Sequence, residues 1–173
     1  MIFSRRQLLI AFRVGVVGVL LLMAARAGWF TVYRVAGTSM LDTLLDGDRI
    51  LVTDEHWMIY PVRPGDTVVF EIQGEVLVKR IVGSPGDRVA LSAGSIIRNG
   101  SVVHEQIPTC YSSRDTMYEL ELGLGEYFVL GDNRSVSVDS RDFGPVDEGQ
   151  ILGKVMLRMS SGGVSTVAAL TRK

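Results

Sequence analysis

Residues 76–88, "VLVKRIVGSPGDR", predict a strand that ends in a turn, because Val, Leu and Ile run up to the turn-forming Ser, Pro, Gly and Asp. Strand alternation places Lys79 on the same face as Leu77 and Ile81. Arg80 faces the other side. A strand that is apolar on both faces is usually covered on both, and lysine is among the residues least often buried. One covered face therefore has to hold a cation, unless the ammonium reaches water.

Short runs of the same kind recur after Arg34, and no long helical period accompanies them. β-branched and aromatic residues bounded by Gly, Pro and Asp predict strands at 48–54, 66–72, 75–82, 88–92, 126–132 and 151–159. Residues 95–104 predict a hairpin that turns at Asn99-Gly100. From Ser160 onward, "SSGG" predicts a frayed end or a linker. The expected fold is therefore mainly β, in one compact domain.

The composition limits the classes of function. A chain of 173 residues with 47% hydrophobic content can bury one domain core. Eighteen basic and nineteen acidic side chains give a net charge of -1 without a basic face, so no nucleic acid partner is expected. The single Cys110 predicts a packed apolar side chain, and His56 and His104 have no metal-ligand spacing. We expect neither a metal nor a cofactor.

The N-terminal residues 4–30 predict a membrane segment. Paired arginines precede an apolar stretch that Arg13 and Arg26 interrupt near its two ends. Over residues 14–25 a helix would rise only about 18 Å, too short for a hydrocarbon core of about 30 Å. Residues 8–30 are long enough if both arginines extend along their stems to the interface. We therefore expect one transmembrane helix, with the paired arginines on the cytoplasmic side.

Two interpretations of this segment are open. "ARA" at residues 25–27 fits a small-residue cleavage site, as in a removed secretory leader. Trp29, Phe30 and Tyr33 favour a retained anchor, since aromatic residues gather at membrane interfaces. Both interpretations place the rest of the chain on the extracytoplasmic side of the cell membrane. The expected organisation is a cytoplasmic start and anchor over 1–33, a β domain over 34–159 and a C-terminal tail over 160–173.

Lys79 has two explanations. A long side chain near a strand end can reach the surface along its stem. Alternatively, burial holds the amine neutral, because desolvation lowers a lysine pKa by up to about 3 to 5 units, from about 10.4 to near neutrality. A neutral lysine is a base, and it would activate a nucleophile without any histidine.

Two further stretches hold candidates for chemistry. In residues 35–52, "VAGTSMLDTLLDGDRILV", Ser39 ends a short strand-like run before a turn-rich segment. By itself it predicts only a turn residue or a helix cap. In residues 125–146, "GEYFVLGDNRSVSVDSRDFGPV", turn-forming residues follow a strand, and a pair of Asp139 and Arg141 can brace such a loop.

Four boxes together resemble the bacterial type I signal peptidase family, membrane-bound serine proteases that use a Ser/Lys dyad. "SMLDTL" at 39–44 resembles that family's S-M-x-P-T-L. "GDTVVF" at 65–70 and "KRIVGSPGD" at 79–87 resemble the next two boxes. "GDNRSVSVDSRDFGPV" at 131–146 resembles G-D-N-x-x-x-S-x-D-S-R-x-x-G-x-V. The order and spacing of the boxes match as well, which makes the resemblance more specific than any single motif.

The resemblance implies roles for five residues. Ser39 would be the nucleophile and Lys79 the general base. Ser137 would hydrogen-bond to the lysine and orient it, while Asp139 and Arg141 would hold the geometry of the site. An acyl-enzyme would form on the serine, and water would hydrolyse it.

The resemblance also implies a substrate and its surroundings. Signal peptides of exported preproteins would bind extended, with small side chains such as Ala one and three residues before the cut. The oxyanion would bind the Ser39 backbone N–H and neighbouring groups of Gly37, Thr38 and Met40. The lipid bilayer and the secretion translocon would be the neighbouring partners.

This chain departs from the family at two positions. Gly37 stands where some members have a serine that lends its hydroxyl to the oxyanion. Asp42 replaces the proline of the first box, which frees the backbone after Ser39. The segment between Lys79 and Gly131 is too short for the large inserted β subdomain of some members, so a compact core is expected.

Three alternatives share part of the pattern. A related conjugative-transfer peptidase, which matures a pilin or a similar precursor, would suit "DSRDFGPV" equally well. A LexA-like self-cleaving domain also resembles "GTSMLDTLLDGD" followed by "VKR", but here an apolar segment stands where its DNA-binding helices are expected. A LexA-like domain would also lack the box from Ser137 to Val146. A non-catalytic anchored β domain that binds envelope partners would keep the fold without the chemistry.

Overall fold

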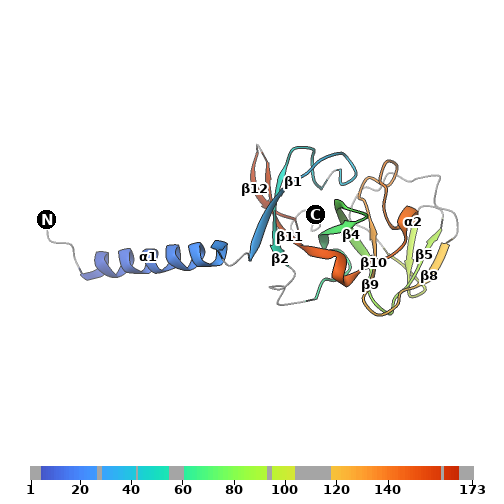
Figure 1. Ribbon diagram of the computed structural model, residues 1–173, viewed down its shortest axis with the longest axis horizontal. Helices are drawn as coiled ribbons and strands as arrows, with labels where there is room; N and C mark the ends of the chain where they lie inside the picture. The colour runs from blue at the N-terminus through green and yellow to red at the C-terminus, as the bar shows by residue number, and fades with distance from the viewer. Residues whose placement is uncertain are drawn as a thin grey trace.

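The computed structural model describes residues 5–26, 29–41, 43–54, 61–92, 95–103, 118–160 and 162–167. One long helix, α1 (Arg5–Arg26), extends away from a domain of antiparallel strands (Figure 1). Several residues that the sequence singles out lie outside the described ranges: Ala27, Asp42, His56, His104 and Cys110.

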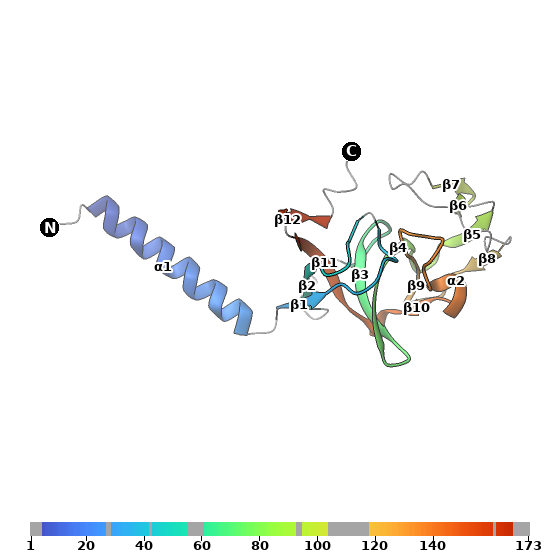
Figure 2. The same ribbon diagram turned by 90° about the horizontal axis from the view of Figure 1, so that it is seen from above.

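Two sheets make up the domain (Figure 2). The larger runs in the order β1 (Phe30–Arg34), β2 (Arg49–Asp54), β11 (Ile151–Ser160), β3 (Thr67–Ile72), β4 (Glu75–Gly83), β9 (Glu126–Leu130) and β10 (Val146–Asp147), and β12 (Gly163–Thr166) pairs with β11. The smaller runs in the order β7 (Ser101–Val102), β6 (Ser95–Arg98), β5 (Arg88–Ser92) and β8 (Tyr118–Glu121). Two short helices, α2 (Ser140–Phe143) and the 3₁₀ helix η2 (Glu148–Gln150), flank β10 in the chain.

The strands lie where the β-branched runs predict them, so the mainly β fold is confirmed. The predicted hairpin is also confirmed, since Arg98 pairs with Ser101 across the turn. Asn99 and Gly100 have φ values of 53° and 79°. Both lie in the left-handed region that a two-residue type I′ turn requires, which explains the Asn-Gly pair.

The N-terminal segment is helical, as expected. Among the described residues, however, we find no helix that combines the length and the apolar character needed to cross a membrane. Strand β1 begins at Phe30 and pairs with β2 along its whole length. The boundary expected after residue 33 therefore falls inside a strand.

The end of the chain differs from its prediction. Instead of a frayed end, residues 163–166 form β12, which pairs with residues 157–160 of β11. Val167, the next residue, is buried in the core. Ser160 and Gly163 of "SSGG" pair at the end of this hairpin, and "GVSTV" is too short to predict a strand by itself.

Two parts of the core matter for the site. The segment between β4 and β9 folds into the smaller sheet, which has its own apolar cluster around Phe128 and Val89. A second cluster lies beneath the connection between β1 and β2 and consists of Val35, Met40, Leu44, Ile50, Val52, Val69, Val155 and Val167.

Candidate active site

Ser39 lies in the connection between β1 and β2, residues 35–48, which we call the Ser39 loop. Its two ends are joined by a hydrogen bond from the Val35 N–H to the carbonyl oxygen of Asp48, at 2.8 Å. Gly37 turns the chain just before Ser39 with a φ of 91°, and its N–H donates to Asp46 Oδ1 at 2.8 Å. The loop is therefore closed at its stem and braced across its middle.

Two buried side chains, Met40 and Leu44, anchor this loop. The Leu44 N–H donates to the Met40 carbonyl oxygen at 2.8 Å, which is the i to i+4 spacing of a helical turn. Both side chains consequently point into the cluster beneath the loop. Ser39, one residue before this turn, is half-buried and keeps its hydroxyl at the surface of a groove.

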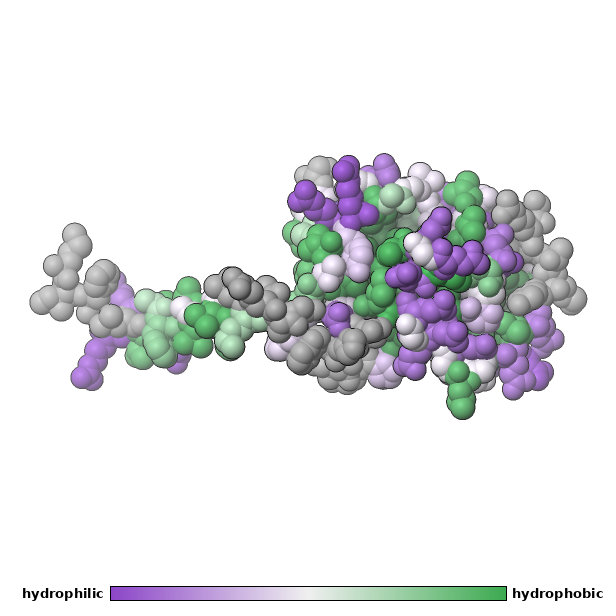
Figure 3. Space-filling view, in the orientation of Figure 1, coloured by the Kyte–Doolittle hydropathy of each residue, from purple (hydrophilic) through white to green (hydrophobic). Residues whose placement is uncertain are grey.

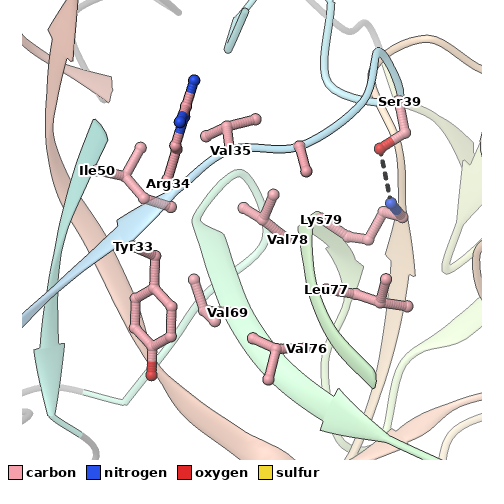
Figure 4. A pocket seen from close by; sticks show the side chains of 11 residues that line it. Tyr33, Arg34, Val35, Ser39, Ile50, Val69, Val76, Leu77, Val78 and Lys79 are labelled. Atoms are coloured by element: carbon pink, nitrogen blue, oxygen red, sulfur yellow. Dashed lines mark hydrogen bonds between the residues drawn. The ribbon is translucent and has the colours of Figure 1, made fainter. Parts of the chain in front are cut away.

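The structure brings Lys79 and Ser39 together (Figure 4). Lys79, on β4, is only 3% exposed, and its Nζ donates to Ser39 Oγ at 2.8 Å. Burial lowers the pKa of Lys79, while the negative charges of Asp139 and Asp132 act in the opposite direction. A lysine that is shielded from water is easier to deprotonate than one in solvent.

An apolar groove extends from this pair (Figure 4). Its cavity volume is about 110 Å³, roughly that of four water molecules at ~30 Å³ each. Such a space suits small side chains. The residues that line it are Tyr33, Arg34, Val35, Ala36, Ser39, Ile50, Val69, Val76, Leu77, Val78 and Lys79.

The turn after β9 holds the Ser39 loop from the other side. The Asn133 N–H donates to the Ser39 carbonyl oxygen at 2.9 Å, and Asn133 Nδ2 donates to the Thr38 carbonyl oxygen at 3.2 Å. Gly131 has no side chain in the way, and its N–H donates to Asp139 Oδ2 at 3.0 Å. Two boxes that are far apart in the sequence therefore meet at Ser39.

Asp139 and Arg141 brace this turn. Arg141 donates from Nε to Asp139 Oδ1 at 2.8 Å and from Nη2 to Asp139 Oδ2 at 3.0 Å. The side chains of Arg141 and Asp139 are 6% and 0% exposed, respectively. Asp139 also caps the N-terminus of α2, and Arg141 Nη2 donates to the Arg134 carbonyl oxygen at 2.7 Å. The pair thus fixes the loop that carries Ser137.

The fold and these four boxes agree with comparisons to known proteins. The signal peptidase family, peptidase S26, matches residues 8–160. The chain belongs to this family. It is 32% identical over 158 residues to signal peptidase I V of Bacillus subtilis, which covers 83% of this chain and 94% of that protein. It is 36% identical over 146 residues to signal peptidase IB of Staphylococcus aureus, which covers 74% of this chain and 76% of that protein.

A solved structure is also similar. The crystal structure of a signal peptidase I from Enterococcus faecalis superposes with a TM-score of 0.50 at 27% identity, covering 56% of this chain and 97% of that chain. The resemblance predicted from the boxes is thereby confirmed, and so is the class of enzyme, a serine peptidase. Family membership favours this class over the LexA-like and non-catalytic alternatives.

Ser137 does not fulfil its implied contact in this signal peptidase structure. Its side chain is 1% exposed, and its Oγ finds no hydrogen-bond partner among the described residues. Instead, Ser137 Oγ lies against Gly131, where a Cβ on residue 131 would overlap it. The hydroxyl is therefore buried and does not donate to Lys79.

The resemblance also implies that Gly37, Thr38 and Met40 bind the oxyanion or the substrate. These residues adjoin Ser39 in the chain, but they do not line the groove. Gly37 and Thr38 are exposed, and Met40 is 1% exposed in the core. Of the described residues lining the groove, none is Gly37, Thr38 or Met40. No hydrogen bond joins the Ser39 N–H to another described residue, so this donor is available. The Ser39 backbone N–H is therefore a candidate for binding an oxyanion.

The structure contains a buried ion pair next to Lys79 that the sequence analysis did not predict. Arg80 donates from Nε to Asp132 Oδ1 at 2.9 Å and from Nη2 to Asp132 Oδ2 at 2.8 Å. Thr43 Oγ1, from the Ser39 loop, donates to the same carboxylate. The alternation of β4 puts Arg80 on a covered face, where a guanidinium needs a partner, but it does not indicate which residue that partner is.

Proposed function

We propose that this signal peptidase family chain is a membrane-anchored serine endopeptidase that removes signal peptides from exported preproteins with a Ser39/Lys79 dyad. The observation that carries the proposal is the 2.8 Å contact between Lys79 Nζ and Ser39 Oγ, made by an amine that is 3% exposed. Serine hydroxyls are weak nucleophiles unless a base takes the proton. A buried neutral lysine at this distance is such a base.

The reaction takes place in two halves. Lys79 Nζ accepts the proton of Ser39 Oγ as this oxygen attacks the scissile carbonyl carbon. The ammonium then gives the proton to the leaving amine, and the peptide bond breaks to give an acyl-enzyme. In the second half, Lys79 takes a proton from water, whose oxygen attacks the ester. Ser39 regains its proton, and the signal peptide leaves with a free carboxylate.

The oxyanion of each tetrahedral intermediate binds the Ser39 backbone N–H in this account. Support comes from that donor being available and from the loop being fixed on both sides by Asp46 and Asn133. Gly37 offers no hydroxyl, so the Ser39 backbone N–H is the donor that we propose.

The groove binds an extended substrate segment. Strand β4 pairs with β3 over Glu75–Arg80 but with β9 only over Arg80–Gly83, so among the described strands none pairs with its groove side at residues 76–79. An unpaired strand edge accepts another strand through main-chain hydrogen bonds. The apolar lining and the small volume favour Ala-sized side chains one and three residues before the cut.

Helix α1 is the proposed anchor. Its 22 residues extend about 33 Å at 1.5 Å each, and apolar side chains gather along the middle of its described part on the face seen in Figure 3. Phe12 and Val14 are 70% and 67% exposed, which is unfavourable in water. Arg13 would extend along its stem toward the headgroups. This topology leaves the N-terminus cytoplasmic and the β domain outside, where preproteins emerge from the secretion translocon.

Two assays test the anchor. Full-length protein should stay with the membrane during alkaline extraction, and protease added to spheroplasts should reach only the β domain. Release of the protein into the soluble fraction would contradict the anchor. Sequencing the N-terminus of the membrane-bound protein shows whether the segment before Ala27 is retained or removed.

The function is tested with full-length protein reconstituted in lipid vesicles and a panel of preproteins with Ala-x-Ala cleavage sites. The wild type should cut after the second Ala, and Ser39→Ala should not. Preproteins with Phe in place of either Ala should resist cleavage, because the groove is small. Cleavage of a pilin-type precursor alone would instead favour the conjugative-transfer peptidase. Cleavage by Ser39→Ala would contradict the mechanism.

A further inference from the structure

Strand β11 contains an irregularity where it pairs with β2. Val155 pairs with Val52 and Arg158 pairs with Ile50, while Met156 has no partner on β2. Paired residues on neighbouring strands point to the same face. Since Val52 and Ile50 are both buried in the cluster beneath the Ser39 loop, the bulge at Met156 turns Arg158 onto that face together with Val155.

On that face, Arg158 contacts both ends of the second half of the Ser39 loop. Its Nε lies 2.6 Å from Asp48 Oδ2, an ion pair whose side chains are 12% and 6% exposed. This contact is a charge pair and not a hydrogen bond, since Arg158 Nε has no hydrogen-bond partner among the described residues. Its Nη1 donates to the Thr43 carbonyl oxygen at 3.0 Å. Asp48 Oδ2 also accepts the Leu45 N–H at 2.8 Å. The Arg158 guanidinium therefore contacts the Ser39 loop at two places, Asp48 at its end and Thr43 near its middle.

The connection continues to the proposed base. Thr43 Oγ1 donates to Asp132, and Asp132 in turn is held by the buried Arg80. Arg80 adjoins Lys79 on β4. Thr43 thus makes two contacts for the Ser39 loop. Its carbonyl oxygen accepts from Arg158, and its hydroxyl donates to Asp132, whose partner Arg80 is next to Lys79 on β4.

We propose that Arg158 is a positioning residue for the peptidase reaction, which holds the Ser39 loop so that Ser39 Oγ stays within reach of Lys79 Nζ. The inference rests on the proposed function of those two residues. A reactive geometry tolerates little error, since a displacement of about 1 Å can cost on the order of 100-fold in rate. Residues 35–48 also contain no proline that would fix the backbone of the Ser39 loop.

The test compares single-turnover and steady-state cleavage of one preprotein by reconstituted variants. Arg158→Met keeps an unbranched apolar side chain but removes the positive charge. Asp48→Asn removes the negative charge with which Arg158 pairs. Each should lower kcat by about 10- to 100-fold while KM stays within about twofold, because the groove lining is unchanged. Arg158→Lys should recover part of the loss, since it keeps the charge but loses the contact with Thr43.

The matched control is Lys154→Met, on the same strand. Lys154 Nζ makes an ion pair with Asp66 Oδ1 at 2.7 Å, outside the Ser39 loop. This variant loses a similar ion pair, so it should keep the wild-type kcat. A role in stability alone would lower the melting temperature of Arg158→Met and leave its kcat unchanged below that temperature, and this result would overturn the proposal.

A double variant gives an independent readout. If Arg158 and Asp48 act together, Arg158→Met with Asp48→Asn should be no slower than the slower single variant, whereas additive losses would overturn the coupling. Should Arg158→Met fail to fold, Arg158→Lys and Asp48→Asn test the proposal by the same kcat criterion. An inactive wild type, or an active Ser39→Ala, would contradict the proposed function, whereas an active wild type with an unaffected Arg158→Met contradicts only this inference.

Discussion

The backbone N–H of Asn133 donates to the carbonyl oxygen of Ser39 at 2.9 Å, and the glycine two residues earlier makes room for this approach. A Cβ on Gly131 would lie 2.6 Å from the Ser39 carbonyl oxygen and would overlap Ser137 Oγ. Neither neighbour can yield easily, since one is backbone and the other is buried. The position of Ser39 therefore depends on the absence of a side chain at residue 131.

Gly131→Ala is expected to displace Ser39. The overlap should lower stability by about 1 to 3 kcal/mol, as overpacking does, and should lower kcat by at least about tenfold. Urea unfolding and preprotein cleavage measure the two effects. Gly149→Ala is the control, because a Cβ there meets no atom within 4 Å. Equal activity of the two variants would contradict the close fit at residue 131.

Lys79→Met is expected to stabilise the protein while abolishing cleavage. Burial lowers the pKa of Lys79 in the folded state, so between the folded and unfolded values the unfolded chain binds more protons. Stability of the wild type should therefore rise with pH toward the usual lysine value of 10.5. The advantage of Lys79→Met should be largest at neutral pH and shrink as the pH rises. Urea unfolding at several pH values measures it, and an advantage that grows with pH would contradict the sign.

Arg141→Met is expected to destabilise the protein strongly. It leaves the Asp139 carboxylate buried without its partner, which typically costs about 3 to 5 kcal/mol. Arg88→Met is the control, since Arg88 pairs with Glu119 and Glu121 through side chains that are more than 60% exposed. Such surface pairs contribute about 0 to 1 kcal/mol. Thermal unfolding of the two variants compares them, and similar losses would mean that Asp139 finds another partner.

Val167→Ala tests whether the end of the chain belongs to the core. Val167 is 2% exposed in the cluster beneath the Ser39 loop, so removing two methyl groups should cost about 2 kcal/mol. Val164→Ala, at a position 67% exposed on the adjoining strand, should cost little. Chemical denaturation separates the two cases. If both variants match the wild type, the last strand contributes little to stability.

Much of this structure could be predicted from local patterns. Alternation around Lys79 left two explanations, a side chain that reaches water and a buried amine, and the structure has the buried one. The turn at Asn99-Gly100 follows from the positive φ values that those residues tolerate. Other features depend on contacts between distant residues. Arg80 meets Asp132, 52 residues away, and no periodicity reports such a pairing. The orientation of Arg158 depends on the bulge at Met156, which carries no Gly or Pro to indicate it.

The family resemblance supplied roles but not every contact. It placed Ser39, Lys79 and Asp139 in one site, and the structure brings them together. It also implied a hydrogen bond from Ser137 to the lysine, which the structure does not contain. A sequence motif indicates which side chains lie near one another, but the rotamer of each side chain depends on its packing. Ser137 packs against Gly131.

The most direct test of the account is an NMR titration of the Lys79 amine in full-length protein with 13C-labelled lysine side chains. Lys79→Met assigns the signal by its loss. The account predicts a midpoint below the usual lysine value of 10.5, and a pH-rate profile for cleavage that rises with the same midpoint. A midpoint at or above 10.5, or a cleavage rate that rises elsewhere, would contradict a neutral lysine as the base that activates Ser39.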